Sequence, residues 1–409
     1  MTQTSNQTLQ VVPNQSSSGT SRPMKYLAFP IQARCLNLSG STHALFEKSC
    51  ATFGNMTLLP AKDSQQTPNT VSVIEVHSDL LEAQKALAKL IGNESPLLLI
   101  GKDIPQSLIR EAMTLNLHDI LSVDNLEDEL YPSLLKLSET LANTTPLAPL
   151  VGIVNGKGGS GASFLCSTLS QVAAAHSDAR VAVIDLDLHF GTQSDLLDVT
   201  PEFYITDALS NLAALDKTAI GAITYKKLGV HLLASKPYSL DELLHTHSAQ
   251  SLQALTTQFR LHFDLVMLDI SRGLEGHVGG LLQHCSQLSL VCQQNIVSLK
   301  ETRALINQLE QNYGIPKEQL HIIVNRYSDK VNNISLREIG ESTGVGGVFK
   351  VQNDYQLASS STDLGKPLNE GSGSQLLESD LYRYLEQSLP LELKKQEHSG
   401  LLSKLFRRS

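Results

Sequence analysis

VGIVNGKGGSGASFLCSTLS, the stretch from Val151 to Ser170, decides the fold of this chain. It starts as an apolar run, passes through a turn with four glycines, and ends in a segment whose apolar residues have helical spacing. Glycines are needed in such a turn because its backbone adopts positive φ angles and approaches a ligand closely. A strand, a glycine-rich loop and the start of a helix place backbone N–H groups around a phosphate. The stretch therefore predicts a phosphate-binding loop.

The loop follows the pattern G-x-x-x-x-G-K-[ST] from Gly156 to Ser163 with one departure. Ala162 stands where the pattern has the lysine that reaches the β- and γ-phosphates. A different lysine, Lys157, lies at the entrance of the loop. The residues predicted to contact a nucleotide are those of the whole loop: Gly156, Lys157, Gly158, Gly159, Ser160, Gly161, Ala162 and Ser163.

Two later apolar runs are predicted to be strands that end in carboxylates. Arg180–Leu188 (RVAVIDLDL) contains Asp185 and Asp187, and Phe263–Asp269 (FDLVMLD) ends at Asp269. The carboxyl ends of parallel strands are where an open α/β sheet binds its ligand. A carboxylate there can hold Mg²⁺ through water or orient a nucleophilic water. The three motifs, in this order, favour a nucleotide-binding fold over a bare glycine-rich turn.

Charge and cysteine content limit the classes of function. The 409 residues carry a net charge of −9, whereas sequence-independent DNA binding needs a basic face. The five cysteines are scattered and lack a C-x-x-C pair, which is typical of reduced packing residues. The sequence has no apolar run of membrane-spanning length and does not open like a signal peptide. We therefore expect a cytoplasmic protein.

Composition and patterning divide the chain into five parts. Residues 1–23 are mostly Ser, Thr, Gln and Asn and are predicted to be a disordered lead. Residues 24–142 alternate strand-like and helix-like segments, starting with a strand at Met24–Ile31, which predicts a doubly wound parallel sheet. A linker at 143–149 precedes a second alternating region at 150–389, and 390–409 form a polar linker and a tail. The expected fold class is α/β, a flavodoxin-like doubly wound domain followed by a P-loop NTPase domain with a mostly parallel sheet.

The five strands expected in residues 24–142 resemble a response-regulator receiver domain, but the chemistry of a receiver is missing. Receivers have an acidic pair after the first strand, where Phe29–Gln32 has none. The phosphoacceptor aspartate follows the third strand, where this chain has Glu75, and no lysine lies near Val123 and Asp124 after the fifth. Glu75 is either a mimic of the phosphorylated state or a single polar residue in a strand. We expect a degenerate receiver-like domain that serves for docking or dimerisation and has no enzymatic activity.

A loop that keeps Lys157 and lacks the second lysine resembles the deviant P-loop of the MinD/ParA family of dimeric ATPases. The chain after residue 23 is similar to the TadZ/CpaE family of tight-adherence (Flp-type) pilus assembly proteins, in which a degenerate receiver domain is fused to a MinD/ParA-type domain. Many members have an irregular P-loop, which Ala162 fits. The segments that carry the resemblance are Lys157–Ser163, Asp185–Asp187 and Asp264–Asp269 and, less specifically, Asn295–Arg303, Asn325 and Lys366–Leu368.

The resemblance implies a role for each matching residue. Lys157 would reach a phosphate across a dimer interface, and Asp187 would orient the attacking water. Ser163 would contact Mg²⁺, and Asp269 would be the Walker B carboxylate at that metal. Asn325 would lie near the base of the nucleotide, so the implied cofactors are ATP and Mg²⁺.

The same resemblance implies a homodimer that organises the pilus secretion machinery at the membrane or cell pole. Its partners would be the pilus assembly and secretion ATPase and inner-membrane pilus components, with no specific nucleic acid. The charged hydrogen bond lost at Ala162 contributes about 1.5–3 kcal/mol to binding, and a lost preorganised charge slows a reaction by roughly 10²–10³. We therefore expect ATP binding with weak or absent hydrolysis. Two alternatives stay open: a cycling positioning ATPase of the MinD type, and a ParA-type partitioning ATPase, which the acidic balance disfavours.

The last nine residues, LLSKLFRRS, are predicted to attach the protein to a membrane surface. On a helix, one face would gather the apolar residues Leu401, Leu402, Leu405 and Phe406. An apolar face flanked by basic residues is typical of interfacial helices and resembles the membrane-targeting end of MinD. We expect a peripheral protein on the inner face of the cytoplasmic membrane. A frayed terminus and a segment packed on the ATPase domain are the alternatives.

Overall fold

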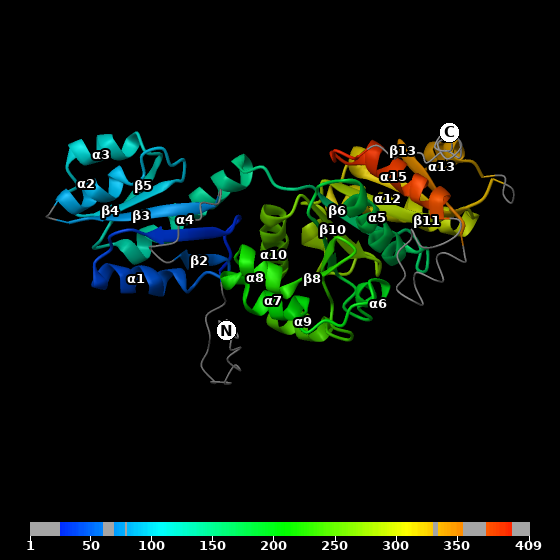
Figure 1. Cartoon of the computed structure of the whole chain (residues 1–409), viewed down its shortest axis with the longest axis horizontal. Helices are drawn as coiled ribbons and strands as arrows, with labels where there is room; N and C mark the ends of the chain where they lie inside the picture. Colours follow the sequence, from blue (N-terminus) through cyan, green and yellow to red (C-terminus); the bar gives the residue numbers. More distant parts are fainter. Residues whose placement is uncertain (1–24, 60–68, 78–79, 330–333, 355–373, 395–409) are drawn as a thin grey trace, which may run out of the picture.

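The protein contains two β-sheets, each covered by helices, one after the other along the chain (Figure 1). The computed structural model describes residues 25–59, 69–77, 80–329, 334–354 and 374–394. The predicted lead at 1–23, the segment Lys366–Leu368 and the predicted membrane tail, with Leu401, Leu402, Leu405 and Phe406, lie outside the described residues. Within the described residues, no helix is both long and apolar enough to cross a bilayer.

The first sheet has five strands, all parallel, in the order β2-β1-β3-β4-β5. This is the strand order of flavodoxin-like doubly wound sheets. Its strands are β1 (Ile31–Cys35), β2 (Met56–Leu59), β3 (Thr70–Val76), β4 (Leu97–Gly101) and β5 (Leu117–Ser122). Its helices are α1 (Gly40–Cys50), α2 (Leu80–Ala88), α3 (Gln106–Met113) and α4 (Leu126–Thr144). Helices α1 and α4 pack on one face of the sheet, and α2 and α3 pack on the other.

The first strand lies further along the chain than the predicted strand Met24–Ile31, so that prediction is wrong. The strand is Ile31–Cys35, which pairs with both β2 and β3. Pro30 has no N–H to give to a sheet ladder, so the ladder starts after it. Leu36 and Asn37 follow the strand. The strand therefore has no acidic pair directly after its actual end either.

The second sheet has eight strands in the order β13-β12-β11-β6-β10-β7-β9-β8. Among these described strands, only β8 is antiparallel to its neighbour, so the predicted mostly parallel sheet is confirmed. The strands are β6 (Leu150–Asn155), β7 (Val181–Asp185), β8 (Tyr225–Lys227), β9 (Val230–Leu233), β10 (Leu265–Ile270), β11 (Gln287–Gln293), β12 (Leu320–Tyr327) and β13 (Gly347–Gln352). The central strands read as continuous apolar runs because helices cover both of their faces.

Two helical layers cover the second sheet. Helices α5 and α15 pack on one face against Val151 and Ile153 of β6, while α7, α10, α12 and α13 lie on the other face with Leu150 and Val154. The helices are α5 (Ala162–His176), α6 (Thr192–Leu196), α7 (Ile205–Ser210), α8 (Lys217–Ile223), α9 (Leu240–Thr246), α10 (Ala249–His262), α11 (Gly279–Leu282), α12 (Ile296–Tyr313), α13 (Leu336–Thr343) and α15 (Ser374–Ser388), with short 3-10 turns η1 (Leu212–Ala214) and η2 (Lys317–Gln319).

The segment that leads from the first sheet to the second is held by hydrogen bonds. Helix α4 runs to Thr144, into the predicted linker, and β6 begins at Leu150 (Figure 1). The Ala148 N–H donates to Arg260 O (3.1 Å), and Arg260 Nε donates to Ala148 O (2.7 Å). Because Arg260 lies near the end of α10, the chain that enters the central strand is tied to this helix.

Candidate functional site

The glycine loop lies at the carboxyl edge of the second sheet, where its strand β6 has β10 on one side and β11 on the other. Gly161, directly before α5, has a φ of +102°, a conformation that favours glycine. A Cβ atom on Gly161 would collide with the side chain of Asn325, and one on Gly156 would collide with Thr302. Asn325 Nδ2 donates to Ser160 O (2.9 Å). The structure therefore brings the predicted loop and Asn325 into contact.

Lys157 is half-buried in the first turn of the loop, and no acidic side chain of the described residues pairs with its ammonium group. Gly158 and Gly159 beside it are exposed. Ser160 Oγ donates to Lys157 O (2.7 Å) and closes the turn. Gln293, at the end of β11, donates from Nε2 to Gly159 O (3.3 Å). The charge of Lys157 is thus available to an anion that approaches the loop.

Ala162 is fully buried, and its methyl group belongs to the apolar layer beneath α5. Its N–H donates to Asn155 Oδ1 (3.1 Å), and Asn155 Nδ2 donates to Ser271 O (2.7 Å). The position that carries a lysine in the general pattern therefore has no charge, and one N–H of the loop already has a partner. Asn155 was not among the predicted site residues. The available signal was a polar residue at the end of an apolar strand.

Three carboxylates gather at the same edge of the sheet. Asp185 and Asp269 are fully buried on neighbouring strands, directly beside each other in the register, and Asp187 is nearly buried. Asp185 accepts the N–H of Asp187 (2.9 Å) and the N–H of Gln193 (3.0 Å). Burial, and then the charge of Asp269, raises the pKa of Asp185 well above its usual value, and burial also raises the pKa of Asp269. Buried negative charges this close together favour the uptake of a proton or a cation.

Asp187 organises the loop that follows β7. Its Oδ1 accepts the N–H groups of His189 (3.2 Å) and Phe190 (3.1 Å), and Arg272 Nε lies 3.9 Å from the same oxygen. The Arg272 guanidinium also covers the ring of Phe190 at 4.8 Å, and that ring meets Tyr238 edge to face. Phe190 is 48% exposed and Tyr238 is 79% exposed. An aromatic and basic surface therefore lies directly outside the carboxylates.

Gln193, which belongs to no predicted motif, joins this loop to α5 and β10. Its Nε2 donates to Ser163 O (2.9 Å) and to Asp269 Oδ2 (2.7 Å). The Ser163 hydroxyl is hydrogen-bonded to Asp269 as well, and the Ser271 N–H donates to Asp269 Oδ1 (3.0 Å). Ser163 and Asp269, the two residues predicted at Mg²⁺, are thus in contact. Nothing in the sequence marked Gln193, because its role depends on how the loop folds back.

Three buried oxygen atoms beside these carboxylates have no hydrogen-bond partner among the described residues: Thr192 Oγ1, Gln193 Oε1 and Ser271 Oγ. Buried polar atoms without a partner are rare in native proteins and commonly mark a water molecule or an ion. Carboxylate, hydroxyl and amide oxygens are the ligands that Mg²⁺ prefers. The side chains at this edge therefore fit a Mg²⁺ ion, which neutralises phosphate oxygens where it binds with a nucleotide.

The carboxyl edge of the first sheet has a different arrangement, centred on Glu75. Its buried carboxylate accepts the N–H of Ser39 (2.7 Å) and the hydroxyl of Thr42 (2.7 Å), both at the start of α1. His77 Nε2 lies 3.5 Å from the same carboxylate. The side chain of Asn37 bonds the backbone of Glu75 on both sides, donating to its carbonyl (2.8 Å) and accepting its N–H (3.0 Å). Glu75 therefore links β3 to the N-terminus of α1.

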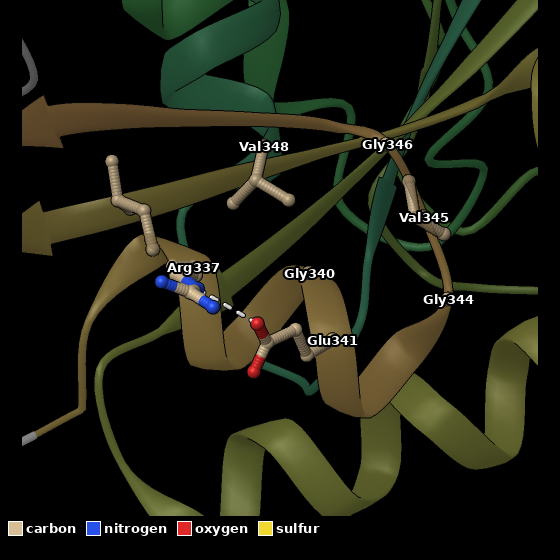
Figure 2. A pocket seen from close by; sticks show the side chains of 8 residues that line it. Arg337, Gly340, Glu341, Gly344, Val345, Gly346 and Val348 are labelled. Atoms are coloured by element: carbon tan, nitrogen blue, oxygen red, sulfur yellow. Dashed lines mark hydrogen bonds and ion pairs between the residues drawn. The ribbon is translucent and has the colours of Figure 1, made fainter.

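Figure 2 shows a pocket of about 530 Å³ between α13 and β13. Gly344 and Gly346, which line it, precede β13 and so lie at the amino edge of the parallel sheet, opposite the glycine loop. Its titratable groups, Arg337 and Glu341, pair with each other along α13 (2.7 Å; Figure 2). The pocket brings no catalytic groups together and is not a candidate active site.

No protein-family model matches the chain, and no curated protein matches its sequence. Solved structures do match it in fold. A ParA family ATPase from Chlorobium tepidum TLS aligns with a TM-score of 0.53 and 19% identity over 58% of this chain and 99% of its own. The cell division ATPase MinD of Pyrococcus furiosus aligns with a TM-score of 0.50 and 20% identity over 59% and 99%.

The septum site-determining protein MinD of Pyrococcus horikoshii OT3, solved as a complex with Mg-ADP, aligns with a TM-score of 0.50 and 18% identity over 59% of this chain and 97% of its own. At such identities the similarity establishes the fold. Over nearly three fifths of its length, the chain has the mixed α/β fold with a parallel sheet of the MinD and ParA ATPases.

Proposed function

We propose that the protein is a MinD/ParA-like positioning protein that binds ATP and Mg²⁺ at the loop from Gly156 to Ser163. One observation carries this proposal. The same sheet edge holds a glycine loop with Lys157 available to an anion and a buried carboxylate cluster with oxygens that lack partners. A phosphate group at this loop would meet the N-terminus of α5, which favours negative charge.

Each predicted site residue has a place in this proposal. Ser163 and Asp269 would hold Mg²⁺, since they already contact each other beside the partnerless oxygens. Asp187 would orient a water with Oδ2, because the loop N–H groups bond only its Oδ1. Asn325 would lie near the base, and Lys157 would reach the phosphate held by a second copy of the chain.

Hydrolysis would be slow. The fully buried Ala162 contributes no charge to the transferred phosphoryl group, and a preorganised charge at that position accelerates such reactions by roughly 10²–10³. ATP would then act mainly as a ligand that holds a homodimer together. A bound nucleotide of this kind sets the state of the protein through binding energy rather than through turnover.

The first sheet and its helices would form a receiver-like docking or dimerisation domain that takes no phosphate. Glu75 occupies the place expected for a phosphoacceptor at the end of β3. Its carboxylate already accepts hydrogen bonds from the start of α1. Lys102, which follows β4, pairs with Asp124 (2.7 Å). Lys102 would therefore have to leave Asp124 to contact a phosphoryl group on Glu75.

For the biological role, we propose assembly of a tight-adherence pilus, as the TadZ/CpaE resemblance implies. The protein would act in the cytoplasm, on the inner face of the membrane or at a cell pole. Its partners would be the pilus secretion ATPase and inner-membrane pilus components. Membrane contact would depend on Leu401, Leu402, Leu405 and Phe406, and two tails in a dimer would bind with higher avidity than one.

Equilibrium dialysis of the full chain with labelled ATP, with and without Mg²⁺, tests the nucleotide proposal. We expect retained nucleotide, little turnover, and a dimer by light scattering that Lys157→Ala abolishes. Lys217→Ala, an exposed lysine on α8, is the matched control and should change neither result. Absence of nucleotide binding would refute the proposal, and turnover that depends on Asp187 would instead indicate a cycling ATPase.

Sedimentation with anionic liposomes tests the membrane proposal separately. The full chain should pellet, whereas a chain that ends at Gly400, or one that carries Leu405→Glu, should stay in solution. Leu376→Glu is a suitable control, since Leu376 is 62% exposed on α15. Equal pelleting of the truncated chain would show that the tail is not the anchor.

A further inference from the structure

The pocket between α13 and β13, called the edge groove below, exposes part of the apolar core (Figure 2). Leu336 and Val348 line it and are only half-buried, at the margin of the core beneath α13. Gly340, Gly344 and Gly346 line it too and have no side chains to fill its volume of about 530 Å³. Because β13 is the last strand at its side of the described sheet, the groove is open at the sheet edge.

We propose that the edge groove holds the apolar side chains of the tail, residues 401–409 of the same chain, when no membrane is present. The tail then has two alternative places, the groove and the membrane surface, and the groove limits how much of it is available to lipid. The inference rests on the proposed function, because membrane contact is assigned there to this tail. It adds a competing site for the tail on the protein itself.

The first argument is where the described chain ends. Lys394, the last described residue, donates its backbone N–H to His176 O (2.6 Å) and its Nζ to Asp178 Oδ1 (2.6 Å). His176 is the last residue of α5, which begins at the glycine loop, so Lys394 lies at the opposite, amino edge of the sheet. The edge groove lies at the same edge, because Gly344 and Gly346 precede β13.

The second argument is the length of chain that follows Lys394. Helix α5 packs on β6, β10 and β7, and even β7 is separated from β13 by only five strand spacings. Five spacings of about 4.8 Å correspond to about 24 Å across the sheet. Phe406 is 12 residues beyond Lys394, and an extended chain of that length spans about 40 Å. The apolar residues of the tail can therefore pass the sheet edge and enter the groove.

The third argument is chemical complementarity. The four apolar side chains of the tail would leave water against the apolar lining of the groove, which is favourable. Residues 401–409 include three basic and no acidic side chains, whereas α13 (LREIGEST) carries two glutamates and one arginine. Lys317, beside Gly344, is paired with Glu310 (3.5 Å) and adds no net charge. The groove thus offers an apolar surface with a negative rim to an apolar and basic segment.

Docking and membrane contact exclude each other because both use Leu401, Leu402, Leu405 and Phe406. A segment that is partly withdrawn binds its other partner with an affinity reduced by the fraction that is free. A tail docked for about four fifths of the time would therefore bind lipid about fivefold more weakly than a free tail. Filling the groove should restore this affinity.

Gly346→Leu fills the groove without straining the backbone. Gly346 is exposed, has no positive φ, and has no atom within 4 Å of an added Cβ. The chain contains no tryptophan, so Phe406→Trp in the full chain introduces a single fluorophore into the tail. Without lipid, we expect Trp emission that is blue-shifted relative to the same protein in urea. Adding Gly346→Leu should move the emission to that of exposed Trp and increase acrylamide quenching several-fold.

Sedimentation with anionic liposomes then measures the competition. The Gly346→Leu chain, with Phe406 in place, should pellet at about fivefold lower lipid concentration than the natural chain. Gly221→Leu is the matched control, since Gly221 is exposed on α8 and also has no atom within 4 Å of an added Cβ. It should change neither the Trp emission nor the pelleting. Should Gly346→Leu fail to fold, Gly340→Leu decides, because its added Cβ would lie no closer than 3.4 Å to a neighbour in the groove.

Dilution distinguishes the chain's own tail from that of a second copy. The blue shift should not depend on protein concentration, and its loss on dilution would assign the groove to a second copy and overturn the inference. Exposed Trp in the Phe406→Trp chain, or a blue shift that both groove variants leave unchanged, would also overturn it. Absence of pelleting in every variant would refute the membrane role of the tail, whereas the Trp emission would still decide whether the groove holds it.

Discussion

The carboxyl edges of the two sheets both carry acidic residues, but these residues differ in how fully their surroundings are hydrogen-bonded. Both sheets place acidic residues where parallel strands finish: Glu75 near the end of β3 in the first sheet, and Asp185 and Asp269 in the second. In the first, the carboxylate is matched by donors from its own chain, Ser39 and Thr42. In the second, three buried carboxylates accompany oxygen atoms that have no partner among the described residues.

The difference shows that an architecture does not by itself make a binding site. An edge is complete without a ligand when its polar atoms are hydrogen-bonded to one another. When such an edge is also buried, its hydrogen bonds hold neighbouring elements of the fold together. An edge with excess negative charge and partnerless oxygens is complete only when something positive enters. The number of partners at each polar atom, rather than the fold, separates the two edges.

The largest expected effect comes from breaking the complete edge with Glu75→Ala. The change leaves the partly buried Ser39 N–H and the buried Thr42 hydroxyl without an acceptor, which costs about 3 kcal/mol. Hydrogen exchange in the full chain should show this as roughly a hundredfold loss of protection in the amides of α1.

Glu47→Ala is the control, because Glu47 lies on the same helix with its side chain 64% exposed. Its effect on the α1 amides should be small, as for other surface ion pairs. Equal protection in the two variants would mean that Glu75 is only a polar residue in a strand. In neither protein do we expect an acyl phosphate after incubation with acetyl phosphate.

A smaller effect is expected from removing charge at the incomplete edge with Asp185→Asn. The pKa of Asp185 is raised by burial and by Asp269, so the folded protein binds protons more tightly than the unfolded chain. Stability should therefore fall as the pH rises from about 4 towards neutral, since the unfolded carboxyl group titrates near pH 4. Asp185→Asn should remove part of this slope in thermal unfolding measured with EDTA.

Asp264→Asn serves as the opposite case, because the hydrogen bond from Arg180 lowers the pKa of Asp264. A lowered pKa contributes stability above the unfolded value, and that contribution is lost as the pH falls. This second variant should change the slope in the other direction, and only slightly, since Asp264 is half-exposed. A slope unchanged by Asp185→Asn would show that the cluster carries no excess charge.

The parts of the site that were predicted from sequence are those that depend on patterns within a short segment of the chain. Glycine spacing indicated the loop, and apolar runs that end in aspartate indicated the strands that bring Asp185 and Asp269 together. Each of these features is predicted from a few consecutive residues, so an error in a neighbouring segment does not affect it. The first strand was misplaced because its position was predicted from the apolar residues before Pro30, although this proline has no N–H to donate to a sheet.

Gln193 and Asn155 could not be predicted because their partners are distant in sequence. Gln193 bonds Asp269 across 76 residues and Ser163 across 30. Asn155 bonds Ser271 across 116. Glu75 illustrates the same limit, since its donors Ser39 and Thr42 precede it by more than thirty residues. Side-chain partners at such separations follow from the packed sheet and not from the pattern of any segment.

The smallest expected effect is a gain at the incomplete edge from Ala162→Lys. A lysine at this position adds the charge that the general loop pattern places at the β- and γ-phosphates. A charged hydrogen bond contributes about 1.5–3 kcal/mol, part of which is offset because the stem starts in the buried layer beneath α5. We expect Mg²⁺-dependent ATP affinity to rise about tenfold by equilibrium dialysis. Ala162→Met has a similar length without the charge and should bind no more tightly than the natural chain. If the two variants bind ATP equally, the loop does not cradle phosphate, and the second edge differs from the first only in its excess of buried charge.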